Sequence, residues 1–303
     1  MKYERKNEYQ AIKIESIDEI YGIISEYNNF WSSPRKECGE EVRTFYRGQS
    51  NSQWGIQPSL LRSGKRECEV IAESSDYGSS LFELISHIQH YKTGTRFIDF
   101  STDPDVAMFF ACSENSNSDG ALFLQLFLCH EPNWYTTCAV CELSKIPENK
   151  ISVKEFAERL IDSDRRFAEH FSDTEQLSFE LMSFLEYGIP VVPSEKETET
   201  NTRMRNQKGC FFICGVDFVP KLEENQEFRR LLSYSSKNAF KPHSAVVPDS
   251  LIAPLNAEKQ DRAYPLKSGN GLVKIVIPRE LKKDILSYLS KEKNITREYL
   301  FPD

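Results

Sequence analysis

The chain has 303 residues, of which 39% are hydrophobic and 28% are charged, and its formal net charge is −8. This composition is typical of a globular protein with a real hydrophobic core and excludes a largely disordered chain. Proteins that grip duplex DNA usually carry an excess of positive charge, so the negative balance argues against sequence-specific binding of duplex DNA. It argues equally against an anionic membrane surface as a partner.

No apolar run approaches the ~20 residues that a membrane-spanning helix needs, and the opening MKYERKNEYQ lacks the apolar segment of a secretory signal. We therefore expect a cytoplasmic protein without a membrane partner. The eight cysteines are then expected to be reduced thiols. Cys138 and Cys141 form a lone CxxC motif without a second pair at zinc spacing, so we expect no metal site.

The first third of the chain contains alternating signals for helices and strands. Residues 15–30 repeat apolar side chains at helical spacing, and VRTFYRGQ at 42–49 is rich in the β-branched and aromatic residues of a strand. Residues 50–66 predict a loop with a short turn of helix. An amphipathic helix is predicted over 79–91, followed by a short strand over 93–100.

The rest of the chain continues with interspersed elements. Asp103 or the preceding Thr102 caps a helix that has proline in its first turn. The almost continuous apolar run at 120–128 predicts a central strand, and 207–218 predicts another buried strand. Residues 153–187 predict a helical region, and 272–278 predict a strand that precedes a closing helix.

These elements do not alternate regularly, which favours the α+β class over a doubly wound parallel sheet. We expect a single domain over residues 1–303, with an N-terminal helical extension at 1–40 and a helical insertion at 150–205. The polar stretches 194–206 and 234–270 are the best candidate linkers, but neither is convincing enough to divide the chain.

Four clusters carry residues that are suited to chemistry. Arg47 and Gly48 place a guanidinium beside open backbone at a strand end, which suits a phosphate or a planar amide. The segment from Thr95 to Pro104 joins a strand to a helix start, where free N–H groups favour an anion. The alternatives are a surface arginine at a turn and an ordinary capped junction.

The other two clusters are His90 with Tyr91 at a helix end, and the basic stretch RMRNQK at 203–208. A helix-terminal histidine is often only a favourable partner of the helix dipole. The basic stretch is either a solvated loop or an approach for a ligand that carries phosphate. The chain contains no Walker, GxGxxG, HExxH or GxSxG motif, which removes the commonest enzyme classes.

Together, four blocks resemble the FRG-domain family in the order that this family shows. They are FYRGQSNSQWGIQPSLLR, IQHYKTGTRFIDFSTDPDVAMFFA, RMRNQKGCFFICG and the closing stretch that ends in LFPD. The resemblance spans about residues 42–303.

A more distant resemblance is to ADP-ribosyltransferases of the Arg-Ser-Glu type. It rests on the strand that ends in Arg-Gly, the Ser-Thr block and a late strand entered through a polar loop. This resemblance implies an ADP-ribosyltransferase-like mixed sheet with surrounding helices, and NAD as the substrate. It implies that Arg47 holds the dinucleotide, that Ser101 and Thr102 brace the nicotinamide pocket, and that Gln207 stands where the family has glutamate.

The implied catalytic residues are Arg47, Gln207 and Asp99. The implied NAD-binding residues are Arg47, Gly48, Gln49, His90, Tyr91, Thr95, Arg96, Ser101, Thr102 and Phe109. The acceptor would meet Arg203, Arg205 and Lys208.

The function that follows is a NAD-dependent ADP-ribosyltransferase toxin of a bacterial phage-defence or toxin–antitoxin system. It would modify RNA or a protein, would need no metal, and would have an antitoxin or chaperone partner. Two alternatives stay open. The first is a nucleotide- or RNA-binding sensor without chemistry, because Gln207 carries no charge. The second is a nuclease or other hydrolase that uses Asp99, His90 and Glu180.

Overall fold

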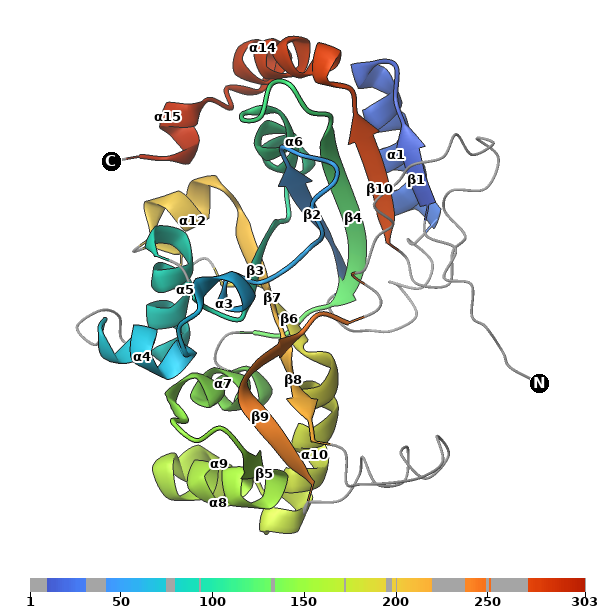
Figure 1. Ribbon diagram of the computed structural model, residues 1–303. Coiled ribbons are helices and arrows are strands. Elements are labelled where there is room, and N and C mark those ends of the chain that lie inside the picture. The colour runs from blue at the N-terminus through green and yellow to red at the C-terminus, as the bar shows by residue number, and fades with distance from the viewer. Residues whose placement is uncertain are drawn as a thin grey trace.

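The protein is an α+β molecule built on a seven-stranded mixed sheet (Figure 1). The computed structural model describes residues 10–30, 42–74, 80–92, 94–131, 134–171, 173–194, 198–199, 201–219, 238–248, 251 and 272–302. In sheet order, the strands are β1 (Gln10–Lys13), β10 (Val273–Ile277), β4 (Gly120–Leu128), β2 (Val42–Gln49), β3 (Phe97–Ser101), β7 (Gly209–Ile213) and β6 (Ile189–Val191). The predicted class is confirmed, and most of the candidate linker 234–270 lies outside the described residues.

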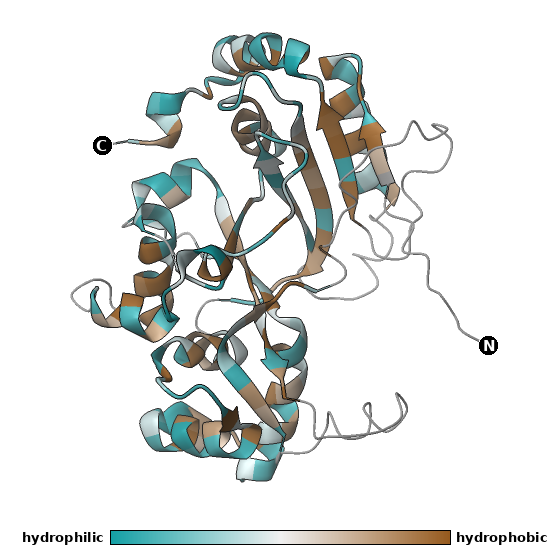
Figure 2. Ribbon diagram, viewed as in Figure 1, coloured by the Kyte–Doolittle hydropathy of each residue, from teal (hydrophilic) through white to brown (hydrophobic). Residues whose placement is uncertain are grey.

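The strands pair antiparallel except for β1 and β10, which are parallel. The central strands β4 and β10 are mostly hydrophobic along their length in Figure 2, and every residue of β10 is buried. Such strands need cover on both faces. One face is covered by α1 (Ile17–Phe30), α6 (Pro104–Cys112) and α14 (Lys282–Lys293), which share a hydrophobic cluster with Leu122 and Leu124. Phe123, which points to the opposite face, belongs to a second cluster that contains Leu60 of α3 (Leu60–Ser63).

The lower part of Figure 1 is a smaller unit around a three-stranded sheet. Its strands are β5 (Ile151–Ser152), β9 (Ala239–Val246) and β8 (Gly215–Phe218). The helices α7 (Tyr135–Glu142), α8 (Val153–Ser163), α9 (Arg165–His170) and α10 (Thr174–Tyr187) share its core. The remaining short elements are α4 (Glu67–Ala72), α5 (Leu81–Tyr91), η1 (Leu143–Lys145), α12 (Thr202–Asn206), η3 (Arg279–Leu281) and α15 (Arg297–Leu300).

Three segments differ from the predictions. Residues 10–13 form β1, which pairs with β10, so this part of the N-terminal region belongs to the main sheet instead of a helical extension. The predicted helical insertion contributes strand β6 to the same sheet. The single strand predicted over 207–218 is two strands in different sheets. The chain leaves β7 beside α10, where a Cβ on Gly215 would lie 2.4 Å from the carbonyl oxygen of Leu185.

The described residues include no helix that is long and apolar enough to cross a membrane. Seven of the eight cysteines are described, and all seven are free thiols.

Helix α6 lies directly on β2 because Gly48 has no side chain. A Cβ at this position would stand 1.8 Å from the carbonyl oxygen of Ala107 and 2.6 Å from the backbone nitrogen of Ala111. Both contacts are with backbone, which cannot move aside without displacing the helix. Gly48 therefore sets the distance between the helix and the strand that carries Arg47.

We expect Gly48→Ala to lower the free energy of unfolding by about 3 kcal/mol, because the added methyl group overpacks a rigid contact. Gly22→Ala is the matched control, since a Cβ at this exposed position in α1 meets nothing within 4 Å. That change should raise stability by up to ~1 kcal/mol, because alanine favours the helix. Denaturant unfolding of both variants tests the prediction, and equal effects would contradict it.

Candidate functional site

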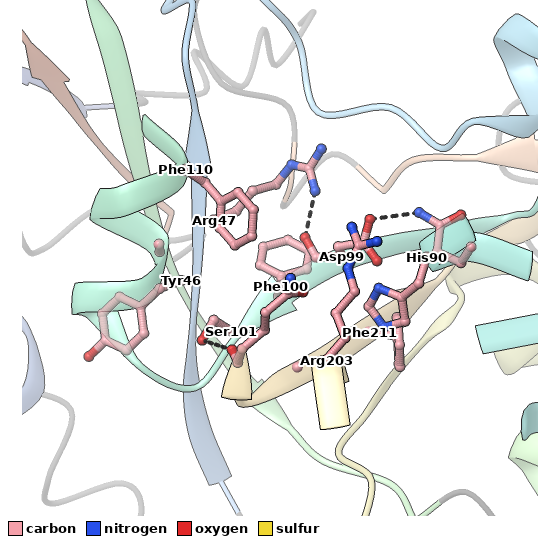
Figure 3. Close-up of a pocket in the computed structure, with 14 residues that line it drawn as sticks. Tyr46, Arg47, His90, Asp99, Phe100, Ser101, Phe110, Arg203 and Phe211 are labelled. Carbon is pink, nitrogen blue, oxygen red and sulfur yellow. Dashed lines mark hydrogen bonds between the residues drawn. The ribbon is translucent and has the colours of Figure 1, made fainter. Parts of the chain in front are cut away.

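The site lies where the main sheet opens between β2 and β3. These two strands share one backbone register, Tyr46 opposite Ser101. Beyond this pair the strands diverge, and a side chain bridges the gap, because the Arg47 guanidinium donates to the carbonyl oxygen of Asp99 at 2.5 Å. A cavity of about 210 Å³ occupies the opening (Figure 3). Its lining residues are Tyr46, Arg47, Gly48, Gln89, His90, Asp99, Phe100, Ser101, Ala107, Phe110, Arg203, Gln207, Gly209 and Phe211.

Asp99 is the single carboxylate among the described residues that line this first cavity. The amide nitrogen of Gln89 donates to its Oδ2 at 2.7 Å, and the amide oxygen of Gln89 accepts from the Thr95 hydroxyl at 2.5 Å. Thr95 therefore fixes the orientation of the amide that holds the carboxylate. The other oxygen, Oδ1, is buried without a partner. A buried acceptor of this kind is usually satisfied by water or a ligand.

Arg47 and Arg203 bring two guanidiniums to the same cavity. Burial lowers the pKa of both arginines, and the Asp99 carboxylate opposes that shift. The Nε atom of each is buried without a hydrogen-bond partner. The guanidinium carbon of Arg203 lies 5.4 Å from the ring centre of Tyr91 and 4.7 Å from that of Phe301, so two aromatic rings hold it in place.

His90 is the remaining titratable side chain near Asp99 in the first cavity. Burial lowers its pKa, and the nearby Asp99 carboxylate acts in the opposite direction. Its ring centre lies 5.6 Å from that of Phe211. The ring is thus kept neutral at neutral pH, where its Nε2 has no partner.

Ser101, labelled in Figure 3, and Gln207 both line the cavity and are joined by a hydrogen bond. The Ser101 hydroxyl donates to the carbonyl oxygen of Gln207 at 2.8 Å and accepts from the Asp103 backbone at 3.0 Å. It therefore ties the end of β3 to the start of α6 and to β7. The amide nitrogen of Gln207 donates to the carbonyl oxygen of Leu300 at 2.9 Å, which anchors α15 across the opening.

A second cavity of about 670 Å³ adjoins the first and shares Arg47, Gly48 and Phe110 with it. Its lining residues are Arg47, Gly48, Gln49, Ser50, Gln53, Trp54, Gly55, Gln57, Arg62, Phe110, Ser113, Glu114, Arg297 and Phe301. Arg47 therefore stands between two adjoining cavities.

The arginines at the two cavities differ from most of the described arginines elsewhere. Ion pairs with carboxylates hold Arg66, Arg96, Arg159, Arg165, Arg166 and Arg279. Among the described residues, no carboxylate lies within ion-pair distance of the four cavity arginines, which are Arg47, Arg62, Arg203 and Arg297. In a protein with a net charge of −8, such a cluster favours an anionic ligand.

The structure brings together Arg47, Asp99, Ser101 and Gln207, with His90 and Arg203 beside them. Gln49 lines the second cavity. The predicted residues that line neither of these cavities are Tyr91, Thr95, Arg96, Thr102, Phe109, Arg205 and Lys208. Glu180, on α10, also lines neither. The described residues contain no group of three His, Cys, Asp or Glu side chains placed to hold a metal ion.

Three of the predicted binding residues have structural positions instead. Arg96 is fully buried, pairs with Glu67 at 2.7 Å and donates to the carbonyl oxygen of Pro242 at 2.6 Å. Phe109 points into the core, and the next residue, Phe110, faces both cavities. Lys208 lies outside the cavities and pairs with Asp103 at 2.7 Å, a hydrogen bond that raises the pKa of the lysine.

Several lining residues were not predicted from the sequence. Trp54 had a usable signal, because a tryptophan in a polar loop beside glycine is poorly placed for a core. Phe110 follows a core position in α6, so the helical period alone turns it away from Phe109. Arg62, Arg297 and Phe301 carried no such signal, because only the fold brings them to Arg47.

Residues 42–120 match the model of the FRG domain. The match runs from the start of β2 to the start of β4, and it contains Arg47, Asp99 and Ser101. The chain therefore carries an FRG domain over these residues. The blocks that contain Gln207 and Arg297 lie outside the match. No curated protein and no solved structure matches the chain.

We expect Glu67→Gln to lower the free energy of unfolding by about 3 kcal/mol or more, because it leaves the Arg96 charge buried without a counter-ion. Glu69→Gln, on the same helix, is the matched control. Glu69 pairs with Arg66 on the exposed surface, where water screens the pair, so stability should barely change. Chemical denaturation measures both. A Glu67→Gln variant as stable as the parent would show that the buried pair does not hold this segment.

Proposed function

We propose that this protein is a NAD-dependent ADP-ribosyltransferase whose active site is the cleft between β2 and β3. The observation that supports the proposal most is the position of Arg47, an arginine without a carboxylate partner between two adjoining cavities. The first cavity contains one carboxylate, that of Asp99, and the second cavity adds the guanidinium groups of Arg62 and Arg297. A dinucleotide has the complementary chemistry, with two charged phosphates between two ring systems.

The reaction breaks the bond between the nicotinamide nitrogen and C1′ of the ribose. The electron pair of that bond leaves with nicotinamide, which becomes neutral, and the positive charge passes to the ribose ring. The acceptor then forms a bond to C1′ and loses a proton. This oxocarbenium-like transition state resembles that of glycoside cleavage. A fixed negative group near the ribose lowers its energy.

The first cavity offers each group that this step needs. Asp99 supplies the negative charge and is held in place by Gln89. Arg47 anchors the phosphates next to it. The rings of Phe100, Phe110 and Phe211 line the cavity as contact surfaces for nicotinamide. In this assignment Asp99 has the electrostatic role, because Gln207 is neutral and its amide nitrogen is bonded to Leu300.

The acceptor belongs to this proposal as either RNA or a protein, approached through the α12 side of the cleft where Arg203 and Arg205 lie. The biological role that belongs to this proposal is that of a toxin in bacterial phage defence or in a toxin–antitoxin pair. The supporting features are the FRG domain and the cleft chemistry.

A non-catalytic nucleotide- or RNA-binding sensor on the same fold is the second candidate. One observation favours it. The residue at the expected glutamate position, Gln207, is buried and its side chain serves to hold α15 in place. Saturable binding of NAD without release of nicotinamide would support this candidate over the transferase.

We expect the purified protein, incubated with labelled NAD and cell lysate, to release nicotinamide and to label an acceptor. Asp99→Asn should lower the rate by roughly 10²-fold or more, because it removes the charge that stabilises the ribose cation. Arg47→Ala should chiefly raise the NAD concentration needed for half-maximal rate.

Asp217→Asn is the control, because this exposed aspartate pairs with Lys241 in the smaller sheet and touches neither cavity. It should leave turnover unchanged. Matching unfolding curves would confirm that each variant is folded. If neither nicotinamide release nor labelling is seen with the unaltered protein, or if Asp99→Asn turns over NAD at the same rate, the proposed active site is wrong.

A further inference from the structure

The wall of the second cavity is a rigid structure. Two buried lysines hold the chain after β2 in place. Lys274 donates to the carbonyl oxygen of Ser52 at 2.8 Å, and Lys282 donates to the carbonyl oxygen of Ser50 at 2.7 Å. Lys282 also donates to the carbonyl oxygens of Glu114 and Asn115 at 3.0 and 3.1 Å. One ammonium group thus joins the chain after β2 to the chain after α6, and both segments contribute residues to the lining of the cavity.

Such an arrangement is costly unless each donor is satisfied, because burial lowers the pKa of both lysines. Three backbone carbonyls accept from Lys282, and the carbonyl of Ser52 accepts from Lys274. As a result, the loop that carries Trp54 is fixed before any ligand arrives, and preorganisation of this kind reduces the entropic cost of binding.

The cavity combines positive charge with aromatic surface. Arg47, Arg62 and Arg297 face it against one carboxylate, Glu114. Trp54 lines it with 48% of its surface exposed, although a side chain of this size is normally buried. Phe301 forms another part of the lining and lies 5.4 Å from the guanidinium carbon of Arg297. Proteins that bind single nucleotides or strands use this pairing of stacking rings with cations.

Gln49 adds a directional group to the same wall. It is 6% exposed, and its amide nitrogen donates to the carbonyl oxygen of Gly55 at 3.2 Å. That hydrogen bond fixes the orientation of the Gln49 amide, because the nitrogen must face Gly55 and the amide oxygen must point the other way. The oxygen has no partner. A buried amide oxygen without a donor is suited to an exocyclic amino group, such as N6 of adenine.

We propose that the second cavity is an adenine mononucleotide site, in which Trp54 stacks on the base, Gln49 accepts from its amino group, and Arg62 and Arg297 bind the phosphate. The identity of the ligand rests on the proposed function, since the site then receives the adenosine 5′-phosphate end of NAD. The site itself needs no chemistry, so it is tested with AMP alone.

The experiment is calorimetric titration of the full chain with AMP. Trp54→Ala should weaken AMP binding by tenfold or more, because a base stacked on an aromatic ring contributes about that factor. Trp54→Phe should retain most of the affinity. Trp134→Ala is the control, since this tryptophan is equally exposed, at 51%, beside α7. It should bind AMP like the unaltered protein.

Further titrations separate the contribution of the phosphate to binding from that of the base. Arg297→Ala should weaken AMP binding several-fold, whereas Arg165→Ala, an exposed arginine on α9, should not. IMP, which carries a carbonyl oxygen in place of the amino group, should bind about fivefold more weakly than AMP, and Gln49→Leu should abolish that difference. Inorganic phosphate should compete only weakly.

The proposal is overturned if AMP does not bind, if Trp54→Ala and Trp134→Ala behave alike, or if inorganic phosphate binds as tightly as AMP. These outcomes are independent of the proposed function. Binding of AMP without cleavage of NAD would contradict the transferase and support the mononucleotide site. Cleavage of NAD without binding of AMP would support the transferase and contradict the mononucleotide site.

Discussion

The single backbone register between Tyr46 and Ser101 is the constraint on which the site depends. On one side of this pair, β2 pairs over its whole length with β4, and on the other side β3 pairs with β7. The two halves of the sheet are thus each complete, and the cleft opens where they part. Arg47 closes part of the lost pairing with its side chain, and Ser101 ties the base of the cleft to Gln207.

The distribution of charge follows from the same division. Inside the two halves, the buried cations have partners, since Arg96 pairs with Glu67 and Lys282 donates to backbone carbonyls. At the cleft, four arginines remain without carboxylates even though the protein as a whole is acidic. Keeping like charges together destabilises a fold, so such a cluster is consistent with a site selected for an anion, at some cost in stability.

The fold was predictable where hydrophobic pattern decides the structure. The bounds of β2 and β4 agree with the apolar runs at 42–49 and 120–128, and Asp103 caps α6 as its position before proline indicates. Strand β1 was missed because four residues show no period and its partner is distant in the sequence. Arg297 and Phe301 were missed for a related reason, because the second cavity exists only once the chain after β2 meets the segment after α14.

In the transferase proposed above, a glutamine at position 207, where Arg-Ser-Glu enzymes have glutamate, does not remove the electrostatic function of the cleft. What a ribose cation requires is a negative charge in a fixed position, and it does not matter which strand supplies it. Asp99 lies on β3, opposite Phe211 of β7, and Gln89 and Thr95 hold its carboxylate through two hydrogen bonds in series. Gln207 in turn anchors α15, whose neighbour Phe301 stacks on Arg203 and lines the second cavity. The neutral side chain of Gln207 thus links the walls of both cavities, and the negative charge is that of Asp99 on the neighbouring strand β3.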